Sequence, residues 1–126
     1  MEFHTYLGYA IPGGFGLLVL LTIFYVMRNR APHDSYWTVL GVLQGIVALQ
    51  LVVGLVLFAG GGRPQSNGPQ WLHYVYGAAF PGLVLLVAHR LAAKKFQEVP
   101  WVVFGVASFF CCFSTIRALQ TGLGID

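Results

Sequence analysis

Four long stretches without charged residues dominate the chain, and short polar segments separate them. Each stretch approaches or exceeds the ~20 residues that a helix needs to cross the hydrocarbon core of a bilayer. Helices are the expected form, because a backbone surrounded by lipid must satisfy its hydrogen bonds within its own segment. The pattern therefore predicts a single all-α integral membrane domain over residues 1–126, a bundle of four transmembrane helices at about 5–28, 36–60, 70–92 and 99–119.

Charged residues make up only 9% of the chain, and the mean hydropathy is +0.73. A soluble domain carries about 25% charged residues. So little charge cannot cover a water-facing surface, which excludes a soluble enzyme, a nucleic-acid-binding protein with a basic face and a disulfide-stapled secreted domain. The net charge of +3 comes from arginines and lysines in loops, so the lipid bilayer is the one partner that composition implies.

Basic residues are divided unevenly between the predicted loops. The loop between the second and third stretches and the C-terminal tail hold one each, Arg63 and Arg117, whereas the other two loops hold five: Arg28, Arg30, Arg90, Lys94 and Lys95. The positive-inside rule places the basic loops in the cytoplasm and both termini outside. No charged segment precedes the first stretch and no small-residue cleavage site follows it, so we expect a retained span of a multi-pass protein of the cell's inner (plasma) membrane.

The motif H-x-x-x-G-x-A-x-P-G occurs twice, 69 residues apart, at the starts of the first and third predicted helices. It begins at His4 and again at His73. A second match, W-x-V-x-G-V, begins at Trp37 in the second helix and at Trp101 in the fourth. Self-similarity of this kind indicates a duplicated unit. We therefore predict two helical hairpins related by a pseudo-two-fold axis along the membrane normal.

This repeat places His4 and His73 at matching depth near the outer face, provided that the first helix begins before His4. Gly8 and Gly77 follow one turn later on the same helix faces. Each glycine is followed four residues later by a proline, which removes the usual partner of the glycine carbonyl and kinks the helix.

Two imidazoles that face each other can ligate a haem iron from both sides. Gly8 and Gly77 would let the flat macrocycle approach, because a Cβ at either position would collide with it. Arg63 and Arg117 lie on the same membrane side and suit the carboxylates of the haem propionates. The alternative is that the histidines are ordinary interfacial residues and that glycine and proline only shape close helix packing.

The other polar residues point to structural roles. Gln44 and Gln50 are expected to bridge helices, although a quinone carbonyl would also suit them. The side chains of the adjacent Cys111 and Cys112 must diverge on a helix, which favours a buried structural role over a disulfide. His33 and His89 share the cytoplasmic side, where a loop residue and a helix-end residue are favoured over a second haem site.

Several catalytic and transport signatures are absent from the sequence. No carboxylate lies inside any predicted span, whereas proton-coupled and cation-coupled carriers normally place one there. No Ser/His/Asp set, zinc-type spacing or phosphate loop is present either. The sequence therefore disfavours a transporter and an enzyme.

Three short motifs carry a resemblance to a known group of proteins. They are the opening His4-Thr5-x-Leu7, the stretch Leu49-Gln50-x-x-x-Gly54-Leu55 and the pair Leu72-His73. With them the chain resembles small four-helix bacterial membrane proteins described as cytochrome b or cytochrome b561-like. The resemblance implies a b-type haem protein that passes electrons within a membrane redox chain, with His4 and His73 as the matching ligand positions. Such proteins often carry another histidine where Ala48 stands, so a di-haem arrangement is not implied.

A second function fits the same sequence. Short loops, small-residue faces and the lack of a soluble domain suit a haem-free accessory subunit of a respiratory or photosynthetic membrane complex. In either role the expected partners are other membrane redox subunits or a second copy of the chain, with quinone as a further candidate ligand and no nucleic acid.

Overall fold

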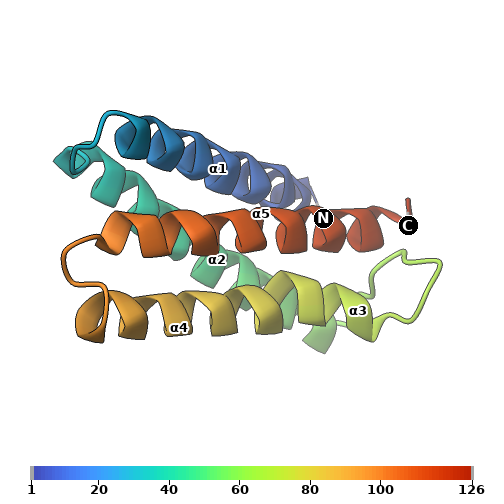
Figure 1. Cartoon of the computed structure of the whole chain (residues 1–126). Helices are drawn as coiled ribbons and strands as arrows, with labels where there is room; N and C mark the ends of the chain where they lie inside the picture. The colour runs from blue at the N-terminus through green and yellow to red at the C-terminus, as the bar shows by residue number, and fades with distance from the viewer. Residues whose placement is uncertain (1, 126) are drawn as a thin grey trace.

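The computed structural model describes residues 2–125, which form four long helical rods joined by short connections (Figure 1). The first two rods are α1 (Glu2–Met27) and α2 (Asp34–Ala59), and the last is α5 (Pro100–Leu123). The third rod consists of three consecutive segments, which are α3 (Trp71–Tyr74), the π-helical turn η1 (Val75–Ala79) and α4 (Phe80–Lys94). Each rod is long and apolar enough to cross a membrane. The prediction of an all-α membrane protein with four transmembrane helices is confirmed.

Two helix ends differ from the predicted bounds. Helix α1 begins at Glu2, so His4 lies within its first turn, as a facing pair of histidines requires. Helix α5 continues to Leu123, where Gly124 adopts a left-handed conformation (φ 73°) and its N–H bonds to the carbonyl of Gln120. Polar residues near the end of α5 mask this last turn in a hydropathy pattern, although the side chain of Thr121 is fully buried in the bundle.

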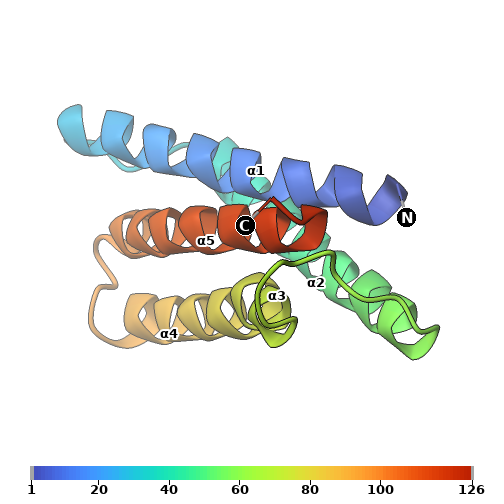
Figure 2. The same ribbon diagram turned by 90° about the vertical axis from the view of Figure 1, so that its right-hand side faces the viewer.

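Helix α5 is the central element of the bundle, with α1 on one side and the α3–α4 rod on the other (Figures 1 and 2). In its most apolar stretch 44% of the residues are buried, against 6% in α2. The buried positions of α5 recur every three or four residues, and most of them are small: Phe104, Gly105, Ala107, Ser108, Cys111, Ser114, Thr115, Ala118 and Thr121. Small residues of this kind let helix backbones approach closely in a membrane.

The tightest approach joins α1 and α5. A Cβ added to Gly105 would overlap the side chain of Thr22. The Thr22 hydroxyl donates to the carbonyl of Leu18 at 2.7 Å and lies 2.8 Å from the hydroxyl of Tyr36. The Tyr36 hydroxyl in turn donates to the carbonyl of Trp101 at 3.1 Å. These bonds connect α1, α2 and α5 through polar groups that are fully partnered inside the bundle.

The prolines of the two motif copies both meet cysteines of α5. The carbonyl of Pro12 in α1 accepts from the thiol of Cys112 at 3.4 Å, and the carbonyl of Pro81 in α4 lies 3.9 Å from the sulfur of Cys111. The adjacent cysteines therefore point to different helices and are both free thiols, in agreement with the structural role expected for them.

The glycines of the two copies also meet α5, about two turns further along it. A Cβ on Gly8 would lie 3.3 Å from Leu119, and a Cβ on Gly77 would lie 3.3 Å from Ala118. Equivalent positions of the repeat thus contact adjacent residues of α5, which sets α1 and the third rod at matching heights on the two sides of that helix.

The second helices of the two predicted hairpins have different surroundings. Helix α5 is central, whereas α2 is buried only at Tyr36, Leu40 and Leu43, in its first half. Its second half is largely exposed. The pseudo-two-fold relation between whole hairpins therefore stays a prediction.

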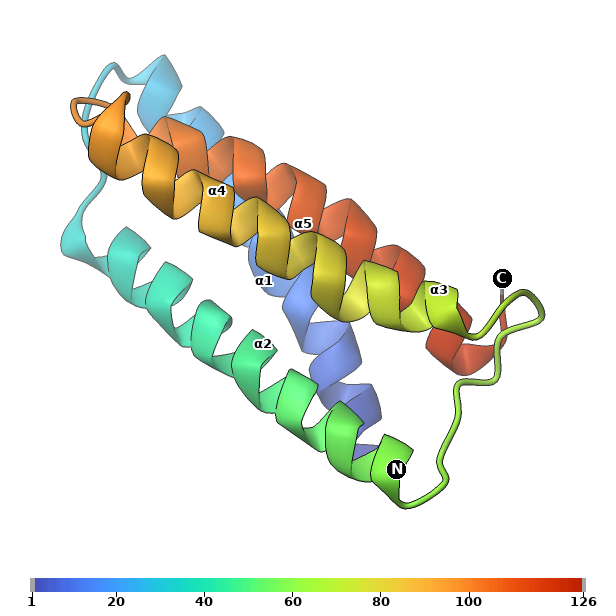
Figure 3. The same cartoon turned by 90° about the horizontal axis from the view of Figure 1, so that it is seen from below.

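The rods alternate in direction, so the bundle has two distinct ends (Figure 3). We call one the basic end, where residues 28–33 connect α1 to α2 and residues 95–99 connect α4 to α5. The other is the terminal end, where both chain termini and the connection over residues 60–70 lie. Five basic residues thus share this end: Arg28 and Arg30 in the first connection, Arg90 and Lys94 in the last turns of α4, and Lys95 directly after it. Positive-inside sorting requires such a grouping at one end.

Candidate functional site

The terminal end brings together the two histidines of the repeated motif. His4, in the first turn of α1, and His73, in α3, have ring centroids 6.2 Å apart and ring planes at 67° to each other. Both side chains are half-buried. Residues 69 positions apart in sequence therefore form one contact, because α1 and α3 pack at the same height on α5.

The His73 ring is held by the last turns of α5. Its Nδ1 lies 2.9 Å from the carbonyl oxygen of Ala118 and 3.1 Å from the hydroxyl of Thr121. A carbonyl can only accept, so the tautomer that satisfies it carries the proton on Nδ1 and leaves the lone pair on Nε2. A ring nitrogen that donates to a backbone carbonyl is the usual outer contact of a metal-bound histidine.

His4 has an incomplete set of partners. Its carbonyl accepts from the side-chain amide Nε2 of Gln50 at 2.8 Å, which ties α1 to the second half of α2. Its ring Nδ1 is buried and has no hydrogen-bond partner, and the same is true of Gln50 Oε1. Buried polar atoms normally have hydrogen-bond partners, so two unpaired atoms on neighbouring side chains are unusual.

The glycines next to the imidazoles are not those of the repeated motif. A Cβ on Gly54 in α2 would lie 3.7 Å from Cε1 of His4, and a Cβ on Gly122 in α5 would lie 3.0 Å from Cε1 of His73. Gly8 and Gly77, in contrast, have their nearest neighbours on α5. The sequence alone indicated no functional role for Gly122, which lies beyond the predicted end of the last helix. Gly54 appeared only as part of a motif that carries the resemblance.

A π-helical turn begins two residues after His73. Pro81 has no N–H to offer the carbonyl of Gly77, and η1 accommodates this gap by widening the helix over Val75–Ala79. Within η1 the carbonyl of Tyr76 accepts from the hydroxyl of Ser114 on α5. Such single-turn π segments occur often at functional sites.

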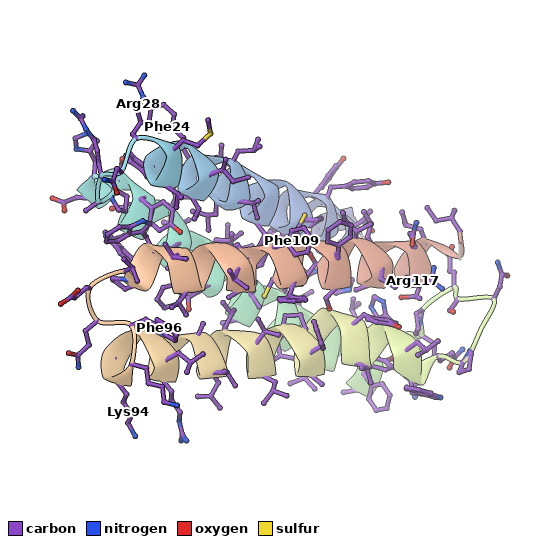
Figure 4. The ribbon with its side chains drawn as sticks, viewed as in Figure 1. Phe24, Arg28, Lys94, Phe96, Phe109 and Arg117 are labelled. Atoms are coloured by element: carbon purple, nitrogen blue, oxygen red, sulfur yellow. The ribbon has the colours of Figure 1, made fainter. Side chains whose placement is uncertain are left out.

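The two candidate arginines lie at the terminal end without touching either histidine. Arg63 caps α2, because its Nη1 donates to the carbonyls of Phe58 at 2.9 Å and Gly62 at 2.7 Å, and its guanidinium lies 4.0 Å from the centroid of the Phe58 ring. Arg117 is exposed on α5 and donates to Oε1 of Gln120 at 3.2 Å (Figure 4). Both charges are therefore accessible at this end of the bundle.

The two glutamines of α2 bridge helices, as expected. Gln50 joins α2 to α1 as described above, and Gln44 Oε1 lies 2.7 Å from Nε2 of His89 on α4. His89 also packs its ring against Phe104 at 4.9 Å between centroids. His89 thus has a structural partner, whereas His33 lies in the connection between α1 and α2.

The imidazoles of His4 and His73 are the candidate metal ligands at the terminal end. Across residues 2–125 no group of three or more His, Cys, Asp or Glu side chains could hold a metal ion. A bare ion at this place would lack the three or four protein ligands that it usually takes.

Comparison with protein-family models, with curated proteins and with solved structures finds no match for this chain.

Proposed function

We propose that this chain is a small integral membrane b-type haem protein that passes electrons within a membrane redox chain, in which His4 and His73 would hold one haem. The observation that carries the proposal is the facing pair of imidazoles at 6.2 Å, one of them already bonded through Nδ1 to a carbonyl. A haem needs only two protein ligands, because the porphyrin supplies four nitrogens of its own.

The two imidazoles are close enough to serve one group, because their ring centroids lie 6.2 Å apart, within the range of an edge-on ring contact. The unpartnered Nδ1 of His4 supports a ligand role, because a ligand histidine needs an outer partner for that atom and Gln50 Oε1 is an unpaired acceptor on the side chain that bonds the His4 carbonyl.

Each surrounding residue then has a defined task. His73 holds its lone pair on Nε2 through its bond to Ala118, and Gly54 and Gly122 keep bulk away from the two rings. Arg63 and Arg117 are the cations at this end for the propionate carboxylates. When bound, the haem supplies one-electron chemistry, and two histidine ligands leave no position open for oxygen.

Orientation and partners complete the proposal. The basic end faces the cytoplasm, so the histidine pair lies near the outer face of the inner membrane. Other membrane redox subunits or a second copy of the chain would exchange electrons with it, and quinone is the candidate small-molecule partner.

The experiment is an absorption spectrum of the purified, dithionite-reduced protein after expression with ample haem. The parent is expected to show a Soret band and a sharp α-band, and His4→Ala and His73→Ala are each expected to lose or shift them. His89→Ala is the matched control, because His89 lies on the same rod as His73 and has its partner on α2. A parent without a Soret band, or a spectrum lost in the His33→Ala variant and kept in His4→Ala, would refute the assignment.

A haem-free accessory subunit is the second candidate, and the open face of α2 favours it. A Cβ on Gly41 or Gly45 would meet no atom within 4 Å, so this Gly-x-x-x-Gly face has room for a helix of another subunit. A colourless preparation that remains a stable, fully helical monomer would support this role over the haem protein.

A further inference from the structure

A cleft at the basic end of the bundle lies far from the histidine pair. It has a volume of about 300 Å³ and is lined by Phe24, Tyr25, Arg28, Arg30 and His33. The last turn of α1 and the connection to α2 supply all of these residues. Figure 4 shows Phe24 and Arg28 together at this end, opposite the end that carries Arg117.

The sequence builds this cleft by folding the chain back over the end of α1. Asn29 adopts a left-handed conformation (φ 54°), and its N–H bonds to the carbonyl of Val26 at 3.1 Å. The N–H of Arg30 bonds to the carbonyl of Tyr25, also at 3.1 Å. This pair of bonds is the Schellman motif, which closes a helix and satisfies its last carbonyls. The carbonyls of Tyr25 and Val26 are thereby satisfied, and the chain turns so that Arg28, Arg30 and His33 line one cleft.

The lining carries positive charge without a carboxylate. Arg28 and Arg30 contribute two guanidinium groups, and His33 adds an imidazole whose ring lies 6.2 Å from that of Tyr25. The guanidinium of Arg28 lies 5.3 Å from the centroid of the Phe24 ring. Asp34, the next residue in the chain, begins α2 and is not part of the lining. Two guanidinium groups in one lining suit an anion such as a phosphate.

An exposed apolar stripe leads from the middle of α1 to the cleft. Leu17, Leu20 and Phe24 recur on one helix face and are each about half exposed or more, at 48%, 67% and 49%. Phe24 belongs to both the stripe and the cleft lining. A free phosphate would use only the cations, whereas a lipid would place its acyl chain on the stripe and its headgroup among the arginines.

We propose that this cleft binds the phosphodiester headgroup of an anionic glycerophospholipid, with Arg28 and Arg30 on the phosphate and an acyl chain along Leu17, Leu20 and Phe24. Basic pockets beside transmembrane helices at the cytoplasmic surface recognise such headgroups. The proposal does not depend on the haem, which would lie at the other end of the bundle.

The test compares phosphatidylglycerol with phosphatidylcholine, added in increasing amounts to the detergent-purified protein and counted by native mass spectrometry. We expect one phosphatidylglycerol bound in clear preference to phosphatidylcholine. Arg28→Gln and Arg30→Gln should each weaken binding of phosphatidylglycerol about five-fold, as ~1 kcal/mol for each cation near an anionic lipid implies. The control Lys94→Gln/Lys95→Gln removes two charges from the same end outside the cleft lining and should leave the bound lipid in place.

The remaining outcomes each decide against the proposal. Equal losses in the lysine control would mean that the charge of the whole end, and not the cleft, attracts the lipid. Displacement of the lipid by millimolar glycerol phosphate would assign the site to a soluble phosphate. A parent that binds both lipids equally overturns the proposal without any variant, so the test holds even if an arginine variant does not fold.

Discussion

At the scale of single residues, two of the four buried side-chain polar atoms that lack a partner among the described residues lie on side chains in contact with each other. His4 Nδ1 and Gln50 Oε1 belong to side chains already connected through the bond from Gln50 Nε2 to the His4 carbonyl. One atom donates when it carries the proton and the other accepts, so a small shift of the Gln50 amide would pair them. Gln50 Oε1 would then accept a hydrogen bond from Nδ1 of His4, as the Ala118 carbonyl accepts one from Nδ1 of His73.

Replacing Gln50 by leucine should therefore affect both stability and the histidine pair. We expect the Gln50→Leu variant to lose about 0.5–1.5 kcal/mol of unfolding free energy, because the hydrogen bond from Gln50 Nε2 to the His4 carbonyl is removed. We also expect the reduced α-band to shift or weaken, because His4 loses the side chain that orients it. Thermal unfolding and the reduced absorption spectrum measure the two effects.

The matched control is Gln44→Leu, which removes the other glutamine bridge of α2. Gln44 joins α2 to His89 in α4 and has no contact with the histidine pair. Its loss should lower stability by less, because the bond between Gln44 and His89 is exposed, and should leave the spectrum unchanged. Equal spectral changes in both variants would mean that Gln50 acts only by holding helices together.

At the scale of helices, hydropathy was sufficient for the number and approximate length of the spans, because lipid allows few other backbone structures. Hydropathy could not predict which helix lies at the centre of the bundle. The most apolar stretch of α2 is more hydrophobic than that of α5, at 2.4 against 1.9, yet α5 is the central helix. Lipid and protein interior are both apolar, so burial depends here on small side chains that let backbones approach, and not on hydrophobicity.

The histidine pair was predictable because the repeat fixes height along the helix, which is a property of sequence spacing. The residues around it were not, because they depend on how each helix is rotated. Gly54 and Gly122 face the rings only through the rotation of α2 and α5, and neither belongs to a repeated motif. The contact of Arg63 was not predictable either, because its role as a cap of α2 depends on where that helix ends.

The close approach of α1 and α5 gives a prediction at this scale. A methyl group at Gly105 would overlap Thr22, whose hydroxyl belongs to the network with Tyr36, so Gly105→Ala must push two helices apart. We expect a loss of about 1–3 kcal/mol, the usual cost of overpacking. The control Gly82→Ala adds the same methyl where no atom lies within 4 Å and should be neutral or slightly stabilising. Thermal unfolding in detergent measures both variants, and equal stability of the two would show that Gly105 does not control the approach.

At the scale of the whole molecule, the two ends of the bundle differ in charge and in chemistry. The basic end carries Arg28, Arg30, Arg90, Lys94 and Lys95, and the terminal end carries the histidine pair with Arg63 and Arg117. The function proposed for each end depends on one shared fact, which is the direction in which the bundle crosses the membrane. If the basic end faces the cytoplasm, the cleft proposed for lipid meets the leaflet rich in anionic lipid, and the site proposed for haem lies near the outer surface.

Labelling of single added cysteines in intact cells measures this direction. Five cations against two favour the basic end inside, so Ser66→Cys, in the connection at the terminal end, should react with a membrane-impermeant maleimide from outside. Ser35→Cys, near the start of α2 at the basic end, should react only after the membrane is permeabilised. The unmodified chain is the background control, because Cys111 and Cys112 lie within α5, against α4 and α1. Labelling of position 66 only after permeabilisation, with position 35 labelled in intact cells, would reverse the orientation and move the proposed electron exchange to the cytoplasmic surface.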